Sequence, residues 1–311
     1  MTTRSMFSRL AGLLNRAGGR RSHVCLEVRP DGIAWAAVAS GASPASGFVE
    51  CMPAKRLQTL QGLVDQRNWS GARTTLVLPL DQYQVFQMER PEGVDESELA
   101  DALKWKLKDF LDFPPSDAVS DVFPFPEDAS RGRGALVNVV SARKSLVQEL
   151  VTLVRDTGLE LVTIDIAELA LRNLVSVLDQ NGRGAALVHL RDGYGQMVVC
   201  RKDTLYLSRR LDVAANDLMD VARQENAVQS LALEMQRSLD YYESQLGQVP
   251  PATIQMVARD KSLPLASMVS SYVAASVQML DWSSLGAEAN MDSRCLPAWS
   301  AALPMAGGER S

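Results

Sequence analysis

Two distant segments of the sequence share one pattern, a strand, a tight turn and a second strand, and this repeat limits the possible folds more than any other feature. The first segment, HVCLEVRPDGIAWAAVAS from His23, has turn chemistry at Pro30-Asp31-Gly32. The second, AALVHLRDGYGQMVVCRKDTLYLSRRL from Ala185, predicts three antiparallel strands. Alternating strands and helices follow each segment, so we expect two α/β lobes with a ligand cleft between them.

The chain is long enough for two such lobes, since 311 residues with 46% hydrophobic content can bury more than one core. Apolar periodicity predicts the remaining elements. We expect helices at 57–67, 144–157, 167–178, 217–246 with a break within 224–229, 263–273 and 296–303, buried strands from about 74, 159 and 253, and an edge strand at 276–282.

Residues 81–140 predict a small α+β unit inserted into the first lobe. Asp95 is the expected N-cap of a helix whose inner face is formed by large apolar residues. Pro114 and Pro115 disfavour helix immediately before them, so this helix should end near Asp112 and lead into a strand, AVSDVFPF. A disordered break is expected at 126–134. The apolar face consists of Leu99, Leu103, Leu107, Phe110 and Leu111.

The composition argues against several kinds of site. Only His23 and His189 are available as imidazoles, which excludes a histidine-rich metal cluster and disfavours a Ser-His-Asp site. The four cysteines are scattered, so we expect reduced thiols, no disulfide and no metal. No window is apolar enough to span a bilayer and no signal core begins the chain, which predicts a cytoplasmic protein.

The first 22 residues carry five arginines and no acid, whereas the whole chain has a net charge of −5. Apolar residues from Met6 to Leu14 recur at helical spacing among these arginines. Two interpretations stay open: residues 1–17 bind an anionic membrane surface, or this leader is a frayed segment weakened by its glycines. An acidic chain without a basic-aromatic patch is not expected to bind nucleic acid.

Three segments carry a resemblance to a known family. These are DESELADALKWKLKDFLDFPPSDAVSDVFPF (95–125), LVTIDIAELALRNL (161–174) and LALEMQRSLDYYESQL (231–246). They resemble the PilM family, actin-like cytoplasmic proteins of type IV pilus assembly, and within it the MshI branch of the mannose-sensitive haemagglutinin (MSHA) pilus system. The resemblance implies an α/β, actin-like fold of the FtsA and PilM kind, ribonuclease H-like and two-lobed, with the inserted α+β subdomain.

The resemblance also implies a domain organisation and a partner. The family docks the cytoplasmic N-terminal tail of a PilN-like bitopic inner-membrane protein between the subdomain and the first lobe. We expect a basic amphipathic or disordered leader (1–22), a first lobe (23–80 and 141–182), the subdomain (81–140), a second lobe (183–291), a C-terminal helix returning to the first lobe (292–303) and a disordered tail (304–311).

Trp105 is the expected anchor for this partner. It projects away from the leucine line and lies between Lys104 and Lys106, where an aromatic side chain suits recognition better than packing. The apolar line itself is interpreted as subdomain core. The helix stop and the strand after it form one side of the expected groove, which adds Phe113, Pro114, Pro115, Val122 and Phe123 to the predicted partner-binding residues.

Against the family's nucleotide-binding pattern, this chain departs at three places. In the first hairpin Arg29 replaces the expected glycine and Pro30 removes an amide donor, with Glu27 at the usual aspartate position. The second hairpin has His189 and Arg191 in place of Asp and Gly. The third element has Arg259 and no glycine, which leaves Asp165 and Glu27 as the surviving acids.

We therefore expect no catalysis, no metal and no nucleotide cofactor, and interpret the chain as a scaffold, a pseudo-ATPase held peripherally at the inner membrane. The alternative is an actin-like ATPase that binds ATP and magnesium and whose nucleotide state gates partner binding. A further alternative is that Arg29, Arg191 and Arg259 bind another anion, although such arginines more often pair with local carboxylates. A cytoplasmic module of type II secretion would share the fold.

Overall fold

The structure is a computed structural model and describes residues 22–38, 43–132, 134–179, 181–259 and 263–304. Residue contacts divide it into two compact units. The first unit comprises the chain up to Ala167 together with Pro297–Ala302, and the second comprises mainly Glu168–Leu296. Except for one residue each, the expected leader and tail lie outside the described residues. None of the described helices is long and apolar enough to cross a membrane.

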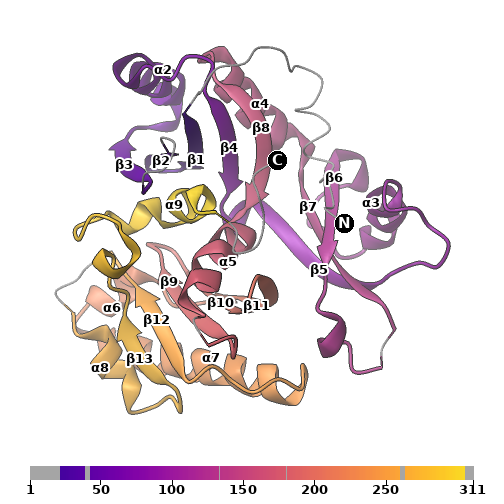
Figure 1. Cartoon of the computed structure of the whole chain (residues 1–311), viewed down its shortest axis with the longest axis vertical. Helices are drawn as coiled ribbons and strands as arrows, with labels where there is room; N and C mark the ends of the chain where they lie inside the picture. Colours follow the sequence, from indigo (N-terminus) through magenta and orange to yellow (C-terminus); the bar gives the residue numbers. More distant parts are fainter. Residues whose placement is uncertain (1–21, 39–42, 133, 180, 260–262, 305–311) are drawn as a thin grey trace. The chain divides into compact units, whose positions relative to one another are not determined.

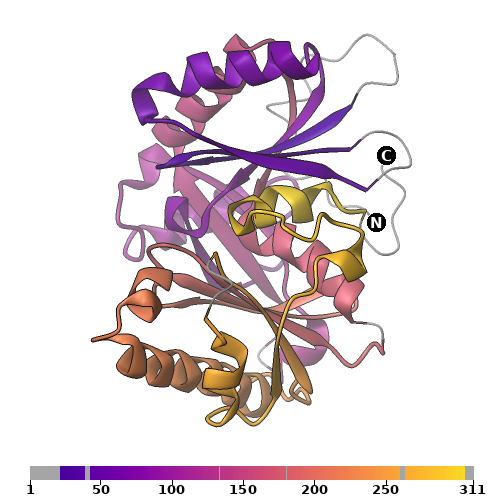
Figure 2. The same ribbon diagram turned by 90° about the vertical axis from the view of Figure 1, so that its left-hand side faces the viewer.

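The first unit is built on a five-stranded sheet in the order β3-β2-β1-β4-β8. The β1–β2 and β2–β3 pairs are antiparallel, and β4 joins β1 and β8 in parallel (Figure 1). Helices α2 and α4 cover one face of this sheet, and α9 lies on the other (Figure 2). These strands and helices are β1 (His23–Arg29), β2 (Gly32–Val38), β3 (Ala45–Glu50), α2 (Arg56–Arg67), β4 (Arg73–Leu78), α4 (Lys144–Asp156), β8 (Glu160–Ile166) and α9 (Leu296–Ala302).

Apolar residues at helical spacing hold these helices on the sheet. Val147, Leu150 and Val154 of α4 are buried and recur at intervals of three and four, so they form one apolar face of that helix. In α9, Trp299 is fully buried and its indole NH donates to the carbonyl of Pro44 at 3.2 Å. The anchored indole explains why this C-terminal helix belongs to the first unit.

A second, three-stranded antiparallel sheet belongs to the same unit. Its order is β5-β7-β6, formed by β5 (Tyr83–Glu89), β7 (Leu136–Arg143) and β6 (Ala118–Pro124). The short helix α3 (Leu99–Lys104) covers one face of it. Leu99, Leu103 and Leu107 pack there against Val137 and Val139.

The helix expected to run from Asp95 to Asp112 is much shorter. The N-cap position is Glu98, with no side-chain cap bond, and Asp95 lies in a preceding turn where its carbonyl accepts from the Glu98 amide. After Lys104 the chain tightens into a 3-10 turn, Trp105–Leu107, and then bends. The three-stranded sheet gives the helix only a short apolar surface, and the tightened turn keeps Leu107 on it while Phe110 points outward, 64% exposed. Phe110 was therefore wrongly assigned to the core.

Two neighbouring predictions fare differently. Pro114 is extended, at φ −61° and ψ 139°, and leads towards β6 as expected. The predicted disordered break at 126–134 is wrong in its first part, because Glu127–Ala129 forms a 3-10 turn and Ala129 is fully buried. The apolar alanine holds this turn on the subdomain.

The second unit repeats the strand order of the first. Its sheet, β11-β10-β9-β12-β13, again starts with three antiparallel strands and continues with two parallel ones. This confirms the duplicated pattern expected from the sequence. Its elements are α5 (Ala167–Leu178), β9 (Ala185–Leu190), β10 (Gly195–Arg201), β11 (Thr204–Leu211), α6 (Ala215–Met219), α7 (Gln224–Ser244), β12 (Thr253–Val257), α8 (Leu265–Ser270) and β13 (Ser276–Met279).

The long helix expected at 217–246 is divided, but earlier than predicted. α6 ends at Met219 because Asp220 is extended, and the Asp220 carboxylate then accepts from the Ala222 amide at 3.0 Å. An aspartate that bonds the backbone two residues ahead forms a turn that competes with the helix. α7 starts four residues after that break.

Candidate functional site: a groove along α4

A groove of about 940 Å³ runs along the exposed side of α4 within the first unit. The α4 residues that line it recur at intervals of three and four, so they form one face of the helix. They are Lys144, Val147, Gln148, Val151, Thr152 and Arg155. Four of these six residues are polar or charged, a composition typical of a solvent-facing helix side, and only Val147 among the six is buried. The sequence analysis therefore missed it.

The walls of the groove are the open edges of two sheets. Gly158–Leu161, at the start of β8, and Ala118–Ser120, at the start of β6, line it as runs of consecutive residues. Consecutive strand residues point to opposite faces, so a cavity that all of them line must lie at the strand edge. β8 and β6 are each the last strand of their sheet. Both edges can therefore offer backbone hydrogen bonds to an added strand.

One set of contacts joins the subdomain to α4, and a second holds the segment before β6 to Arg143, the last residue of β7. The Asp117 carboxylate, just before β6, accepts from the amide and the hydroxyl of Ser145, both at 3.2 Å. Arg143 donates to the Asp112 carbonyl at 3.2 Å, and its guanidinium lies 4.6 Å from the Phe113 ring centroid. The contact between Asp117 and Ser145 thus holds the turn before β6 to the first turn of α4.

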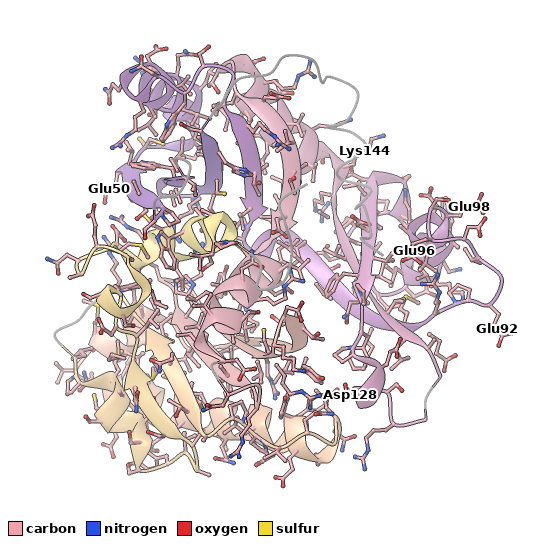
Figure 3. All side chains as sticks on the ribbon, viewed as in Figure 1. Glu50, Glu92, Glu96, Glu98, Asp128 and Lys144 are labelled. Atoms are coloured by element: carbon pink, nitrogen blue, oxygen red, sulfur yellow. The ribbon has the colours of Figure 1, made fainter. Side chains whose placement is uncertain are left out.

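Charged residues of both signs line the groove, three of them basic and two acidic. Lys144 and Arg155 are exposed at opposite ends of the α4 face, and Lys104 and Asp101 come from α3. Glu160 begins β8. Figure 3 shows Lys144 at the end of α4 nearest β6, whereas Glu96 and Glu98 lie farther out, around α3. The groove thus carries more positive than negative charge.

The predicted partner-binding residues lie beside this groove rather than in it. Trp105 is 63% exposed, with the Lys104 ammonium 5.9 Å from its ring centroid. Phe113 is buried under Arg143, and Val122 packs against the leucine core of the subdomain. Phe123 is half-buried on the opposite face of β6, and Pro114 and Pro115 lie in the turn before that strand. None of these six residues is among those that line the cavity.

The first nucleotide-type hairpin is the β1–β2 turn. Arg29 is buried there and pairs with Asp31 at 2.9 Å, within the turn itself. Its carbonyl accepts from Arg56 at 2.8 Å. Glu27 is fully buried in β1. Gly32 has no room for a side chain, because a Cβ there would lie 2.3 Å from the Val49 carbonyl oxygen. This glycine therefore serves strand packing.

The second and third elements meet in the second unit. His189 and Arg191 are buried at the end of β9, and the Arg191 guanidinium lies 5.4 Å from the Tyr194 ring centroid. Arg259, after β12, pairs with Asp192 of the β9–β10 turn at 3.6 Å. Burial tends to raise the pKa of nearby Asp292, but hydrogen bonds from Arg294 and the charges of Arg294 and Arg259 lower it overall. Arg29 and Arg259 thus pair with carboxylates of their own units.

Two acids lie close together in the sequence, one near the end of β8 and one just after it. Asp165 is half-buried, and its carboxylate accepts from the Ile166 amide at 2.8 Å. Glu168, in the first turn of α5, was not singled out in the sequence. Burial raises its pKa to about 8, against a hydrogen bond from its own backbone and one with Gln196 that lower it. Glu168 is therefore largely protonated at neutral pH, which its position at a helix start gave no reason to expect.

The strand order of the two units, together with comparison to solved structures, defines an actin-like ATPase fold. The PilM–PilN type IV pilus biogenesis complex matches with a TM-score of 0.69 and 18% identity, over 91% of this chain and 97% of that chain. A Bacteroides thetaiotaomicron protein with an actin-like ATPase fold and unknown function matches with a TM-score of 0.55 and 10% identity, over 89% and 96%. The predicted fold class is confirmed.

A further similar structure is the cytoplasmic domain of EpsL, an inner-membrane component of the type II secretion system of Vibrio cholerae. Its TM-score is 0.54 at 13% identity, with 90% of this chain and 94% of that chain covered. No protein-family model and no curated protein matches the sequence. At these identities the similarity establishes the fold alone.

Proposed function

We propose that this protein is a non-catalytic scaffold of a type IV pilus assembly complex, which docks the cytoplasmic N-terminal tail of a PilN-like inner-membrane protein in the groove along α4. The protein acts in the cytoplasm, peripherally at the inner membrane. Within this function, the resemblance of residues 95–125 and 231–246 favours the MSHA-type, MshI-like branch.

The observation that carries this proposal is the combination of two open strand edges with one helix face around a single groove. An extended peptide can add a strand to such an edge, while its side chains settle on Val147, Val151 and Ile164. A solved structure with the same fold is named as a PilM–PilN complex. That name supports a PilN-like partner for this chain.

The non-catalytic part of the proposal rests on the hairpins. Pro30 has no amide to offer a phosphate, and the adjacent Arg29 is held by Asp31 in the turn. The Arg191 and Arg259 side chains occupy the corresponding turns of the second unit. The rival function is an actin-like ATPase whose nucleotide state gates partner binding. Its phosphate hairpins need glycine at the positions that Arg29 and Arg191 occupy, and an amide N–H where this chain has Pro30.

Site-specific photocrosslinking tests the docking site. A photoreactive amino acid replaces Gln148, which lines the groove, or its neighbour Glu149, which is also exposed but does not line it. With membranes of the native cell, we expect the Gln148 probe to crosslink the N-terminal tail of a single-span inner-membrane protein and the Glu149 probe to give little product. Equal crosslinking from both positions, or crosslinks only to other segments, would refute the groove as docking site.

A further inference from the structure

We infer that the segment bound in the groove is an acidic, extended peptide, with carboxylates that meet Lys144 and Arg155 at the two ends of the α4 face. This inference rests on the docking function proposed above and adds the chemistry of the bound segment. The evidence for this chemistry is the length of the α4 face and the charge of the residues that line the groove.

The α4 face sets the length. Lys144 and Arg155 are eleven residues apart on one helix, which separates them by about 16 Å along its axis. An extended chain advances about 3.3 Å per residue, so roughly five residues span this distance. The apolar residues Val147 and Val151 lie between the two cations. The bound segment should therefore have apolar side chains in its middle and acidic ones towards its ends.

The charge of the groove favours an acidic segment. Within the described part of the chain, neither Lys144 nor Arg155 forms a salt bridge, although both are exposed at the cavity. Of the two acidic lining residues, Asp101 is on α3 and Glu160 begins β8. Lys144 and Arg155 can therefore form ion pairs with a bound segment, and an extended peptide whose carboxylates face α4 provides the complementary charge.

The same charges argue against occupation by the chain's own leader. Residues 1–22 carry five arginines and no acid. These would be repelled by Lys144, Arg155 and Lys104 rather than attracted. The leader also differs from the expected segment in having no acidic residue at either end of its apolar stripe. A tail from another protein is therefore the occupant that the charges favour.

A displayed random heptapeptide library, selected on the full chain, tests this inference. The chain carries the photoreactive residue at Gln148, so that only peptides crosslinked in the groove are sequenced. Three proteins are compared: the unaltered chain, the double variant Lys144→Glu with Arg155→Glu, and the control Lys108→Glu. Lys108 is exposed on the subdomain but does not line the groove. Thermal unfolding checks that each protein is folded.

We expect Asp and Glu to be enriched over Lys and Arg in peptides from the unaltered chain and from the control. In the double variant this ratio should fall about fivefold or more, because exposed ion pairs contribute up to about 1 kcal/mol each and reversal adds repulsion. Crosslinked peptides without acidic enrichment, or enrichment that survives the double reversal, would overturn the inference and leave the docking groove intact. If no peptide crosslinks at Gln148, the docking function fails and the inference fails with it.

Discussion

The Asp117 carboxylate accepts hydrogen bonds from both the amide and the hydroxyl of Ser145, at 3.2 Å each. The N-cap residue of α4, Arg143, makes no side-chain capping bond. Asp117, in the turn before β6, instead accepts from an amide of the first helical turn, which has no partner within the helix. Asp117 thus caps α4, the helix along the groove, and at the same time holds the start of β6 to that helix.

Asp117→Ala should therefore affect both stability and docking. Loss of a capping carboxylate costs about 1 kcal/mol in typical helices, and the unfastened wall should bind the partner tail less tightly. Urea denaturation measures the first effect, and crosslinking yield at Gln148 the second. Asp109→Ala is the matched control, since Asp109 is an exposed acid of the same subdomain that does not line the groove. If the two variants have the same free energy of unfolding and the same crosslinking yield, Asp117 neither caps α4 nor supports the groove.

Trp105→Ala should weaken partner capture with almost no change in melting temperature. The side chain is 63% exposed, and exposed substitutions usually change the free energy of unfolding by less than about 0.5 kcal/mol. Because Trp105 does not line the groove, its contact would be with a part of the partner beyond the bound segment.

Leu103→Ala provides the opposite case two residues earlier, in α3. Leu103 is fully buried in the subdomain core, so its truncation should cost about 2–5 kcal/mol. If Trp105→Ala destabilises the protein to a similar extent, Trp105 is a packing residue and its predicted anchor role is wrong. Differential scanning calorimetry of both variants decides between these outcomes.

Glu168→Gln should stabilise the protein at pH 8 more than at pH 5. The unfolded carboxyl has a pKa near its ordinary value of 4.5, whereas burial raises the folded pKa to about 8. Between these values the unfolded state has released the proton and the folded state still holds it, so the free energy of unfolding falls as pH rises. Above the folded pKa the native protein carries a buried charge that glutamine lacks.

Urea denaturation of the unaltered chain and of Glu168→Gln at the two pH values measures this effect. The advantage of the variant should grow by a few kcal/mol from pH 5 to pH 8. A constant offset between the two proteins would mean that Glu168 titrates at an ordinary pKa, and that its burial among Gln196 and its neighbours does not hold in solution.

Magnesium-ATP should leave the melting temperature unchanged, because ligands stabilise a protein only when they bind its folded state. Arg29 and Pro30 occupy the turn where a phosphate would need glycine and an amide. The mapped partner tail, in contrast, should raise the melting temperature as its concentration increases. A concentration-dependent increase with magnesium-ATP would favour the gated ATPase instead.

Local sequence signals predicted much of the fold. The turn at Pro30-Asp31-Gly32 and the apolar runs after it are set by neighbouring residues, and the duplicated strand order followed from them. The length of α3 could not be predicted from local signals, because it depends on how much apolar surface β5, β7 and β6 provide for the helix. Pattern alone predicted the extended conformation at Pro114, but not the end of the helix at Lys104 or the 3-10 turn that starts at Trp105.

The site was less accessible to sequence reasoning. The subdomain side of the groove was expected, but Val122 and Phe123 were chosen where Ala118 and Ser120 line it. The α4 face, with Lys144, Gln148 and Thr152, has the polar composition of any solvent-facing helix. Its role depends on the strand edge placed beside it, which is a tertiary relationship. One available signal was the spacing of its residues at three and four across from the buried face.

Hydrogen–deuterium exchange, measured on the protein alone and with the partner tail mapped by crosslinking, tests the docking groove most directly. Added main-chain pairing should slow exchange of the amides in β8 (160–166) and β6 (118–124), or in one of them, while the β9–β10 turn at 191–194 exchanges as before. A tail that binds while both strands exchange at their original rates, with protection elsewhere in the chain, would contradict the account.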